Sequence, residues 1–453
     1  MDFQVKVRDG PARIGQCTFN KETIVTPNIL FLQTSRCNAP TFSDILLTNR
    51  TLRTKKPTIQ IGESIFSPKK NKAQKNLCLQ DYQIYPKDVT TELHLSAYLQ
   101  NKNTECCVIP GKVDLISEQV TKNDANLFII ANAAQLYSHQ SSFVEFITGL
   151  RQKIGYTKMI YLPCVGDPTS VSLLTYMGVD FFDSFSAMMA ARNEIFLFPT
   201  GFYRKNQLPE IPCSCPTCVT KDDVSSMGIG EILQHNYAML FSELKLVRNA
   251  IVTGSLRELV EVRVRTRPHL AALLHILDLH HYKFLEERTP VVRKTSLIAT
   301  TKDSLVRPEI RRFQDRVIQR FEKPPSTKIL LLLPCSAKKP YSFSKSHKLF
   351  RECFLNLANP FVVHEVILTS PLGLVPRELE LTYPASSYDI AVTGHWDEDE
   401  KKMIRALLQD YLKKNTYDAT IIHLPPAMQT FVSDLLHQPQ TTCKDSPTSD
   451  ISL

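Results

Sequence analysis

The sequence predicts an α/β protein with two successive units, each built on buried parallel strands. Between Asn126 and Phe185, amphipathic stretches such as "SSFVEFITGLRQKIG" alternate with short apolar runs such as "NLFIIANA", "KMIYLPCVGD" and "VDFFDSF". Apolar runs of this length are typical of strands buried on both faces, and the stretches between them have the period of a helix. The alternation therefore predicts βα units in a (β/α) barrel or a doubly wound sheet.

A second α/β unit is predicted after the double proline at Pro324 and Pro325. A buried strand that ends in a polar loop is read from "ILLLLPCSAKKPYS", and further strands from "HEVILTS", "YDIAVTG" and "DATIIHLP". An amphipathic helix is read from "DEDEKKMIRALLQDYLKKN". The predicted organisation is a first domain at residues 1–325, a smaller one at 326–430 and a disordered polar tail at 431–453.

Composition places the chain among intracellular globular proteins. A chain of 453 residues is too long for a single hydrophobic core, and 43% of its residues are apolar, as in globular proteins. No run of eighteen apolar residues occurs, and charged residues stand where a signal peptide would be apolar. Twelve cysteines are too sparse for a disulfide scaffold. We therefore expect a cytoplasmic protein without membrane contact, whose net charge of +9 mildly favours a polyanionic partner.

Three closely spaced cysteines in "IPCSCPTCV" predict a metal centre. Cys213, Cys215 and Cys218 have the spacing C-x-C-x2-C, which suits thiolate ligation better than disulfides. The next histidine in the chain is His235, in "EILQHNYAML". Four protein ligands would form a closed tetrahedral site for a structural zinc, without an open position for catalysis. The alternative is a loop of unligated thiols.

A resemblance to tRNA-guanine transglycosylases, especially the archaeal branch, extends along the first domain. It is carried by the cysteine loop followed by "LQHNYAMLFSELKLVRNAI", by "GVDFFDSFSAMMAARN", and by "FQVKVRDGPARIGQ", "LRELVEVRVRTRP" and "SLVRPEIRRF". The resemblance implies a (β/α)8 barrel with a zinc-binding subdomain at about residues 205–255. It also implies a homodimer.

In the same alignment Asp183 occupies the position of the family's nucleophilic aspartate. A carboxylate there could attack the ribose and form a covalent intermediate, or it could be kept at a strand end for hydrogen bonding. The family's "TDSGG"-like loop, which grips the base, has no counterpart between Thr41 and Val120. The resemblance therefore implies a vestigial nucleophile in a barrel that serves as a scaffold.

A second motif lies in the second domain, from Pro334 to His347. The stretch "PCSAKKPYSFSKSH" fits P-C-x3-K-P-Y-x2-S-x2-H and resembles the signature of the archaeosine synthase family, as does the later "TSPLGLVPRELELTYPASSYDIAVTGHW". The resemblance implies an archaeal tRNA-modifying transferase. Its substrate is tRNA that carries 7-cyano-7-deazaguanine in the D-loop, and free lysine adds to the nitrile carbon. A radical SAM partner then converts the adduct to archaeosine.

Residues of this motif suit that chemistry. Cys335, beside two lysines, is expected to have a lowered pKa and to add to the nitrile, or else to be a packed thiol. Lys339 could give a proton to the nitrile nitrogen or pair with a tRNA phosphate. His347 is the candidate general base. Ser344 and Tyr341 would orient substrate groups, or would serve only in capping and packing.

Charged residues further along the chain are candidates for binding the lysine substrate. A carboxylate could hold its ammonium group, and Arg377 could face its carboxylate or a phosphate. All of them could equally be solvated. The carboxylate candidates are Glu378, Glu380, Asp389 and Asp397.

The sequence indicates the part of the chain that binds tRNA less specifically than it indicates the two motifs. Residues 256–322 are predicted to be largely helical, with "RELVEVRVRTRPHLAALLHILDLHHYKFLEER" as the longest candidate helix. Its basic part, Arg257 to Arg267, could bind tRNA or form a solvated face. A separate polypeptide could supply the RNA-binding PUA module that ends the family's chains. Two other functions remain open, a catalytically silent tRNA-binding subunit and a transglycosylase that inserts 7-cyano-7-deazaguanine.

Overall fold

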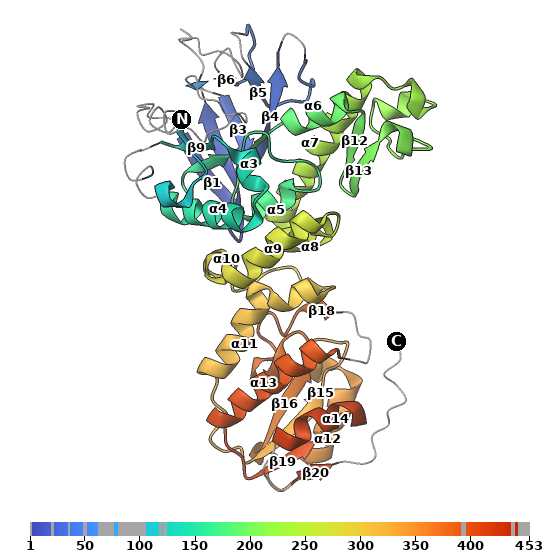
Figure 1. Cartoon of the computed structure of the whole chain (residues 1–453). Coiled ribbons are helices and arrows are strands. Elements are labelled where there is room, and N and C mark those ends of the chain that lie inside the picture. Colours follow the sequence, from blue (N-terminus) through green and yellow to red (C-terminus); the bar gives the residue numbers. More distant parts are fainter. Residues whose placement is uncertain are drawn as a thin grey trace. The chain divides into compact units, whose positions relative to one another are not determined.

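The structure, a computed structural model, consists of two compact units that divide between Thr289 and Pro290. Figure 1 traces the chain through them. Among the described residues, no helix is both long and apolar enough to cross a membrane. The described residues are 2–19, 22–34, 37–48, 52–61, 77–79, 106–116, 120, 125–390, 396–435 and 440–442.

An eight-stranded parallel sheet forms the centre of the first unit. Its order is β7-β6-β5-β4-β11-β10-β9-β8, so neighbours follow the chain and the last strand, β11, pairs back with the first, β4. This is the cyclic order of a barrel, open between β7 and β8 within the described part of the chain. The predicted α/β class with a barrel-type sheet is confirmed. The strands are β4 (Asn28–Gln33), β5 (Ile45–Thr48), β6 (Thr58–Ile61), β7 (Leu77–Leu79), β8 (Cys106–Ile109), β9 (Leu127–Ile130), β10 (Met159–Tyr161) and β11 (Phe181–Asp183).

Helices pack on the outside of this sheet. Those between and directly after the later strands are α3 (Ala133–Tyr137), α4 (Gln140–Ile154), α5 (Val171–Tyr176) and α6 (Phe185–Arg192). In β9, Phe128 and Ile130 join the outer hydrophobic cluster that includes α4, whereas Leu127 and Ile129 join a second, inner cluster. Because side chains alternate along a strand and both faces are buried, the sequence shows a continuous apolar run.

An antiparallel sheet precedes the barrel strands. It consists of β1 (Asp2–Asp9), β2 (Ala12–Phe19) and β3 (Glu22–Thr26). Cys17 and Ile24 from this sheet contribute to the inner cluster of the barrel.

The long helix considered over residues 257–288 is in fact three helices. They are α8 (Leu256–Val264), α9 (Pro268–His280) and α10 (Tyr282–Arg288). Pro268 begins α9, and Arg267 before it is extended, with φ −150° and ψ 133°. A proline disfavours the helical conformation of the residue before it, so this break follows from the sequence.

The segment that carries the three cysteines follows α6 in the chain and projects from the barrel (Figure 1). It starts with a hairpin of β12 (Ile195–Phe198) and β13 (Gly201–Arg204) and continues through short 3₁₀ turns. The helix α7 (Ile229–Thr253) then leads back to the barrel. A small hydrophobic cluster with Phe196, Phe198 and Met227 holds this segment together.

The second unit contains a five-stranded sheet of order β17-β16-β15-β19-β20, in which only β17 is antiparallel. A separate pair joins β14 (Leu297–Ala299) to β18 (Tyr388–Ile390). The other strands are β15 (Ile329–Pro334), β16 (Val363–Thr369), β17 (Gly373–Pro376), β19 (Ala419–Ile422) and β20 (Gln440–Thr442). The helices are α11 (Pro308–Arg320), α12 (Lys345–Leu355), α13 (Glu398–Lys414) and α14 (Pro426–Val432).

The limits of the second unit differ from the sequence prediction at both ends. The strand β14 and the helix α11 precede the double proline in the sequence. They nevertheless belong to the second unit, because β14 pairs with β18 and α11 packs into the same core. In the predicted tail, β20 adds to the edge of the sheet beside β19, so this short stretch is ordered. Residues 436–439 and 443–453 of that tail lie outside the described residues.

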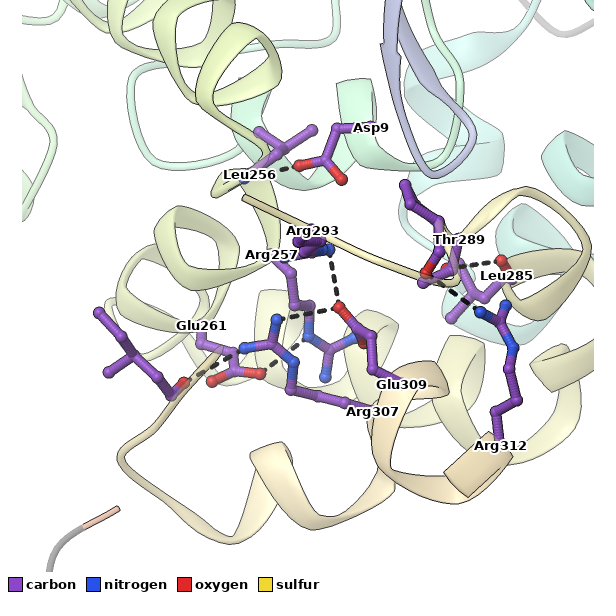
Figure 2. A network of polar contacts seen from close by, with 12 residues as sticks. Asp9, Leu256, Arg257, Glu261, Leu285, Thr289, Arg293, Arg307, Glu309 and Arg312 are labelled. Atoms are coloured by element: carbon purple, nitrogen blue, oxygen red, sulfur yellow. Dashed lines mark hydrogen bonds and ion pairs between the residues drawn. The ribbon is translucent and has the colours of Figure 1, made fainter. Parts of the chain in front are cut away.

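Buried polar contacts stabilise each unit (Figure 2). In the first, Asp9 accepts a hydrogen bond of 2.9 Å from the backbone N–H of Leu256. In the second, the fully buried Glu309 lies 2.7 Å from Arg293 and 3.2 Å from Arg307. The two guanidinium groups hold the pKa of Glu309 at about 2, below its usual value, although burial alone would raise it.

Candidate metal centre and active site

The four predicted metal ligands come together in the first unit. The ligand atoms of Cys213, Cys215, Cys218 and His235 all lie within 4.8 Å of one another. The Nε2 of His235 donates to the carbonyl oxygen of Leu197 at 3.2 Å, which leaves Nδ1 to face the Cys218 sulfur at 3.3 Å. A carbonyl partner of this kind fixes the tautomer of a ligating histidine. The cluster could therefore hold a metal ion such as zinc.

Asp183 lies at the carboxyl end of β11, where barrel enzymes carry their active sites. Its carboxylate is completely buried and accepts three hydrogen bonds. Tyr161 and the backbone N–H of Cys164 donate to Oδ2, both at 2.8 Å, and the backbone N–H of Phe185 donates to Oδ1 at 2.9 Å. Burial raises the pKa of Asp183 to about 6. Its oxygens are thus already paired with the protein, which supports the vestigial role. Most of the segment without a base-gripping loop lies outside the described residues.

The basic segment considered for tRNA is largely neutralised within the first unit. Arg257 is buried and makes two hydrogen bonds of 2.6 and 2.7 Å to Asp278. Arg263 makes two to Glu243, at 2.8 and 3.0 Å. These guanidinium groups already have carboxylate partners, so the prediction of a basic RNA-binding face is wrong for them.

Cys335 lies at the point where the strand order of the second sheet reverses. The chain adds β16 on one side of the central β15 and β19 on the other. Crevices beyond the carboxyl ends of strands at such a switch point bind ligands in open α/β sheets. Cys335 directly follows β15, and Thr369 ends the neighbouring strand β16. Burial raises the pKa of Cys335 although the Thr369 hydroxyl and the charge of Lys339 favour the thiolate, so the expected lowered pKa is wrong.

Lys339 and two tyrosines complete this cluster. The Lys339 ammonium lies 4.2 Å from the centre of the Tyr388 ring, a cation–π contact. Burial lowers the pKa of Lys339, while Cys335 and Asp389 raise it. The Tyr388 hydroxyl lies 2.7 Å from Thr369 Oγ1 and 2.6 Å from the hydroxyl of Tyr341. The hydroxyl groups of Tyr341, Tyr388 and Thr369 therefore form a hydrogen-bonded row.

Two family models match the chain. The first, described as queuine tRNA-ribosyltransferase, matches residues 110–269, which include Asp183 and the metal centre. The second, described as a domain of unknown function, DUF5591, matches residues 310–453, which include the Cys335 motif.

Relatives of known name cover nearly the whole chain. It is 36% identical to the archaeosine synthase subunit alpha of Methanosarcina acetivorans, over 94% of the chain and 68% of the relative. It is 32% identical to the archaeosine synthase of Haloferax volcanii, over 100% of the chain and 72% of the relative. The chain belongs to the archaeosine synthase family. A tRNA-guanine(15) transglycosylase of Methanobrevibacter smithii is 33% identical over 68% of the chain and 47% of the relative.

In this member of the archaeosine synthase family, His347 has a different place from the one expected of a general base. It is buried, its Nε2 donates to the carbonyl oxygen of Pro334 at 3.0 Å, and its Nδ1 accepts from Arg377 at 2.9 Å. Burial and the charge of Arg377 lower the pKa of His347 to about 4. Because both ring nitrogens are engaged, we assign His347 to positioning the strand end that precedes Cys335.

Other motif residues also hold the loop in place. Ser344 caps α12 by accepting a hydrogen bond of 3.2 Å from the backbone N–H of His347. Tyr341 is completely buried. Glu380 accepts from the backbone N–H of Ser342 at 3.0 Å and from Arg377 at 2.8 Å. These contacts correspond to the capping and packing alternatives.

The candidate substrate-binding charges do not form one open site, because Arg377 and Glu380 pair with each other. Arg377 is already paired with Glu365 and Glu380. Glu378 accepts from His364 at 3.1 Å, near the start of β16 and thus at the end of the sheet opposite Cys335. Asp397 caps α13 and pairs with Lys302. Among these candidates, Asp389 alone is both exposed and next to Lys339.

Two residues of the cluster, Thr369 and Tyr388, were not singled out from the sequence. Each lies at a strand end: Thr369 is the last residue of β16 and Tyr388 the first of β18. A polar residue that ends a buried apolar run, as in "VILTS", was the available signal for Thr369. Nothing in the sequence pairs Tyr388 with Lys339.

We expect the pH of half-maximal alkylation of Cys335 to be higher in the folded chain than in the urea-unfolded chain. A raised pKa leaves less thiolate at every pH below it, and alkylation requires the thiolate. Lys339→Ala should move this pH higher still, because it removes a nearby positive charge, whereas the exposed Lys338→Ala should not. Mass spectrometry of the labelled peptide measures both. A lower pH in the folded chain would contradict the burial argument.

Proposed function

We propose that this chain adds free lysine to the nitrile of 7-cyano-7-deazaguanine in the D-loop of tRNA, a transferase step in archaeosine biosynthesis. The observation that carries the proposal is the pairing of Cys335 and Lys339 at the switch point of the second sheet. Membership of the archaeosine synthase family supports tRNA as the substrate. In this proposal a zinc ion on the four first-unit ligands is structural.

In this proposal Cys335 is the nucleophile and Lys339 is the proton shuttle. The S–H bond of Cys335 breaks, a bond forms between its sulfur and the nitrile carbon, and the proton reaches the nitrile nitrogen through Lys339. The deprotonated amine of free lysine then attacks the same carbon. A C–N bond forms, the C–S bond breaks, and the amine's proton returns to the sulfur. The product is an amidine, and the balance requires no oxidant, reductant or nucleotide.

Lys339 suits the shuttle because burial lowers its pKa, which makes its ammonium group a better proton donor than a solvated lysine. Asp389, exposed beside it, is the proposed partner of the substrate's ammonium group. If Cys335 is only a packed thiol, the amine attacks the nitrile directly and Lys339 keeps the same task.

The remaining partners belong to the same proposal. A radical SAM protein would convert the adduct to archaeosine, and the chain would form a homodimer. Copurification with a radical SAM protein and light scattering of the purified chain test these two points.

Mass spectrometry of nucleosides tests the proposed reaction. Nitrile-bearing tRNA is incubated with the purified chain and isotopically labelled lysine, and we expect a nucleoside heavier by one whole lysine. No adduct, with tRNA binding intact, would favour a catalytically silent tRNA-binding subunit. Incorporation of labelled 7-cyano-7-deazaguanine into unmodified tRNA would instead favour base exchange at Asp183.

A further inference from the structure

The outer strand of the β12–β13 hairpin has an unusual surface for a short edge strand. β12 is buried except at its first residue, whereas Phe202, Tyr203 and Arg204 of β13 are all exposed. β13 pairs only with β12 in a two-stranded sheet. Exposed aromatic and basic side chains next to each other are a frequent composition of RNA-binding surfaces, where rings stack on bases and cations bind phosphates.

The hairpin register separates the roles of the two aromatic residues. Tyr203 is paired with Phe196, and its ring contacts Phe198 at 5.7 Å, which in turn contacts the metal ligand His235 at 4.8 Å. Tyr203 therefore packs toward the metal centre. Phe202 points to the opposite face because side chains alternate along a strand, and Arg204 shares its face.

Phe202 lies beside a loop of the barrel. The Arg267 guanidinium lies 4.9 Å from the centre of its ring and is held by Asp167 at 3.1 Å. Asp167 belongs to the loop after β10, at the carboxyl end of that strand. Forty per cent of Phe202 nevertheless stays exposed, so part of its ring is open to a stacking partner.

Arg204 lines a cavity of about 480 Å³ next to the hairpin, which is within the usual size of ligand sites. Three other charged residues line the cavity. Lys205 donates to the carbonyl oxygen of Met227 and lies 4.0 Å from Glu194, and Asp223 accepts from the backbone N–H of Ser225. Within the described part of the chain, the Arg204 guanidinium has no ion pair or hydrogen bond. The other lining residues are Asn193, Asn206, Leu208 and Val224.

We infer that the exposed face of β13 is an RNA contact, in which Phe202 stacks on an unpaired base and Arg204 binds the adjoining phosphate in this cavity. A nucleic acid fits better than a protein partner because the open groups are one ring and one guanidinium that makes no direct ion pair with a described residue. The inference rests on the proposed function for the identity of the RNA, which is tRNA.

Filter binding of nitrile-bearing tRNA to the full chain at several salt concentrations tests this contact. Loss of one stacked base predicts about tenfold weaker binding for Phe202→Leu, with an unchanged salt dependence. Loss of one phosphate contact predicts, for Arg204→Gln, a slope of log affinity against log salt smaller by about one. Lys55→Gln, which removes an exposed charge at a different cavity of the same unit, should change neither value.

Unchanged binding by both β13 variants would overturn the inference, and so would equal effects of Arg204→Gln and Lys55→Gln, which would indicate a diffuse attraction. If the unaltered chain forms the lysine adduct but both β13 variants bind tRNA normally, the proposed function stands and only the RNA contact is removed. If the unaltered chain forms no adduct but both variants bind tRNA more weakly, the RNA contact stands and the proposed function is removed. If the unaltered chain binds no tRNA, both fall.

Discussion

A chain with Lys339→Ala is expected to form the lysine adduct at least a hundredfold more slowly than the unaltered chain, since removal of a positioned proton donor costs about 10²–10⁴ in rate. The ammonium group lies 4.2 Å from the centre of the Tyr388 ring, which fixes its position in the loop. The rate of adduct formation under saturating tRNA and lysine is the measurement.

Lys338→Ala is the matched control, because it removes a lysine of the same loop that is exposed to solvent. Its rate should stay within about twofold of the unaltered chain, as expected for an exposed side chain outside the cluster. If Lys339 instead pairs with a tRNA phosphate, its replacement would weaken tRNA binding and leave the rate at saturation intact. That result would end its assignment as proton shuttle.

Loss of the metal is expected to unfold the cysteine segment and to lower the melting temperature of the chain. The stretch between β13 and α7 contains only short 3₁₀ turns and a small hydrophobic cluster, so the metal would supply much of its stability. Cys218→Ser should bind less than one zinc per chain by metal analysis. It should also be cleaved by protease within residues 205–228 much faster than the unaltered chain.

The control for this experiment is Cys353→Ser, which changes an exposed cysteine on α12. It should keep its zinc, its melting temperature and its resistance to protease. A Cys218→Ser chain that retains one tightly bound zinc and melts like the unaltered chain would contradict the assignment of the four ligands.

The sequence was a good guide to elements whose signals are local. β9 and β15 are apolar runs bounded by polar residues, and the metal ligands follow a fixed spacing, so both could be read directly. The break before α9 was also readable at Pro268. Local pattern determined these features because the backbone and the nearest side chains are enough to form them.

Features that depend on distant partners could not be read in this way. Arg263 looked available until the fold placed Glu243 beside it, and His347 looked like a base until Arg377 occupied its second nitrogen. Whether burial or a neighbouring charge decides the pKa of Cys335 depends likewise on packing around Thr369 and Lys339. Burial and ion pairing are properties of the folded chain, and the sequence does not give their balance.

The pairing of β14 with β18 has a consequence for dissecting the chain. A fragment cut at the double proline would omit both β14 and α11 and would leave one backbone edge of β18 unpaired. Lys339 contacts the ring of Tyr388, which is part of β18. A less stable β18 in such a fragment would therefore also hold the loop around Lys339 less firmly. The residues just before the double proline, which the sequence assigned to the first domain, are thus part of the second unit, and an excised second unit has to begin before Leu297.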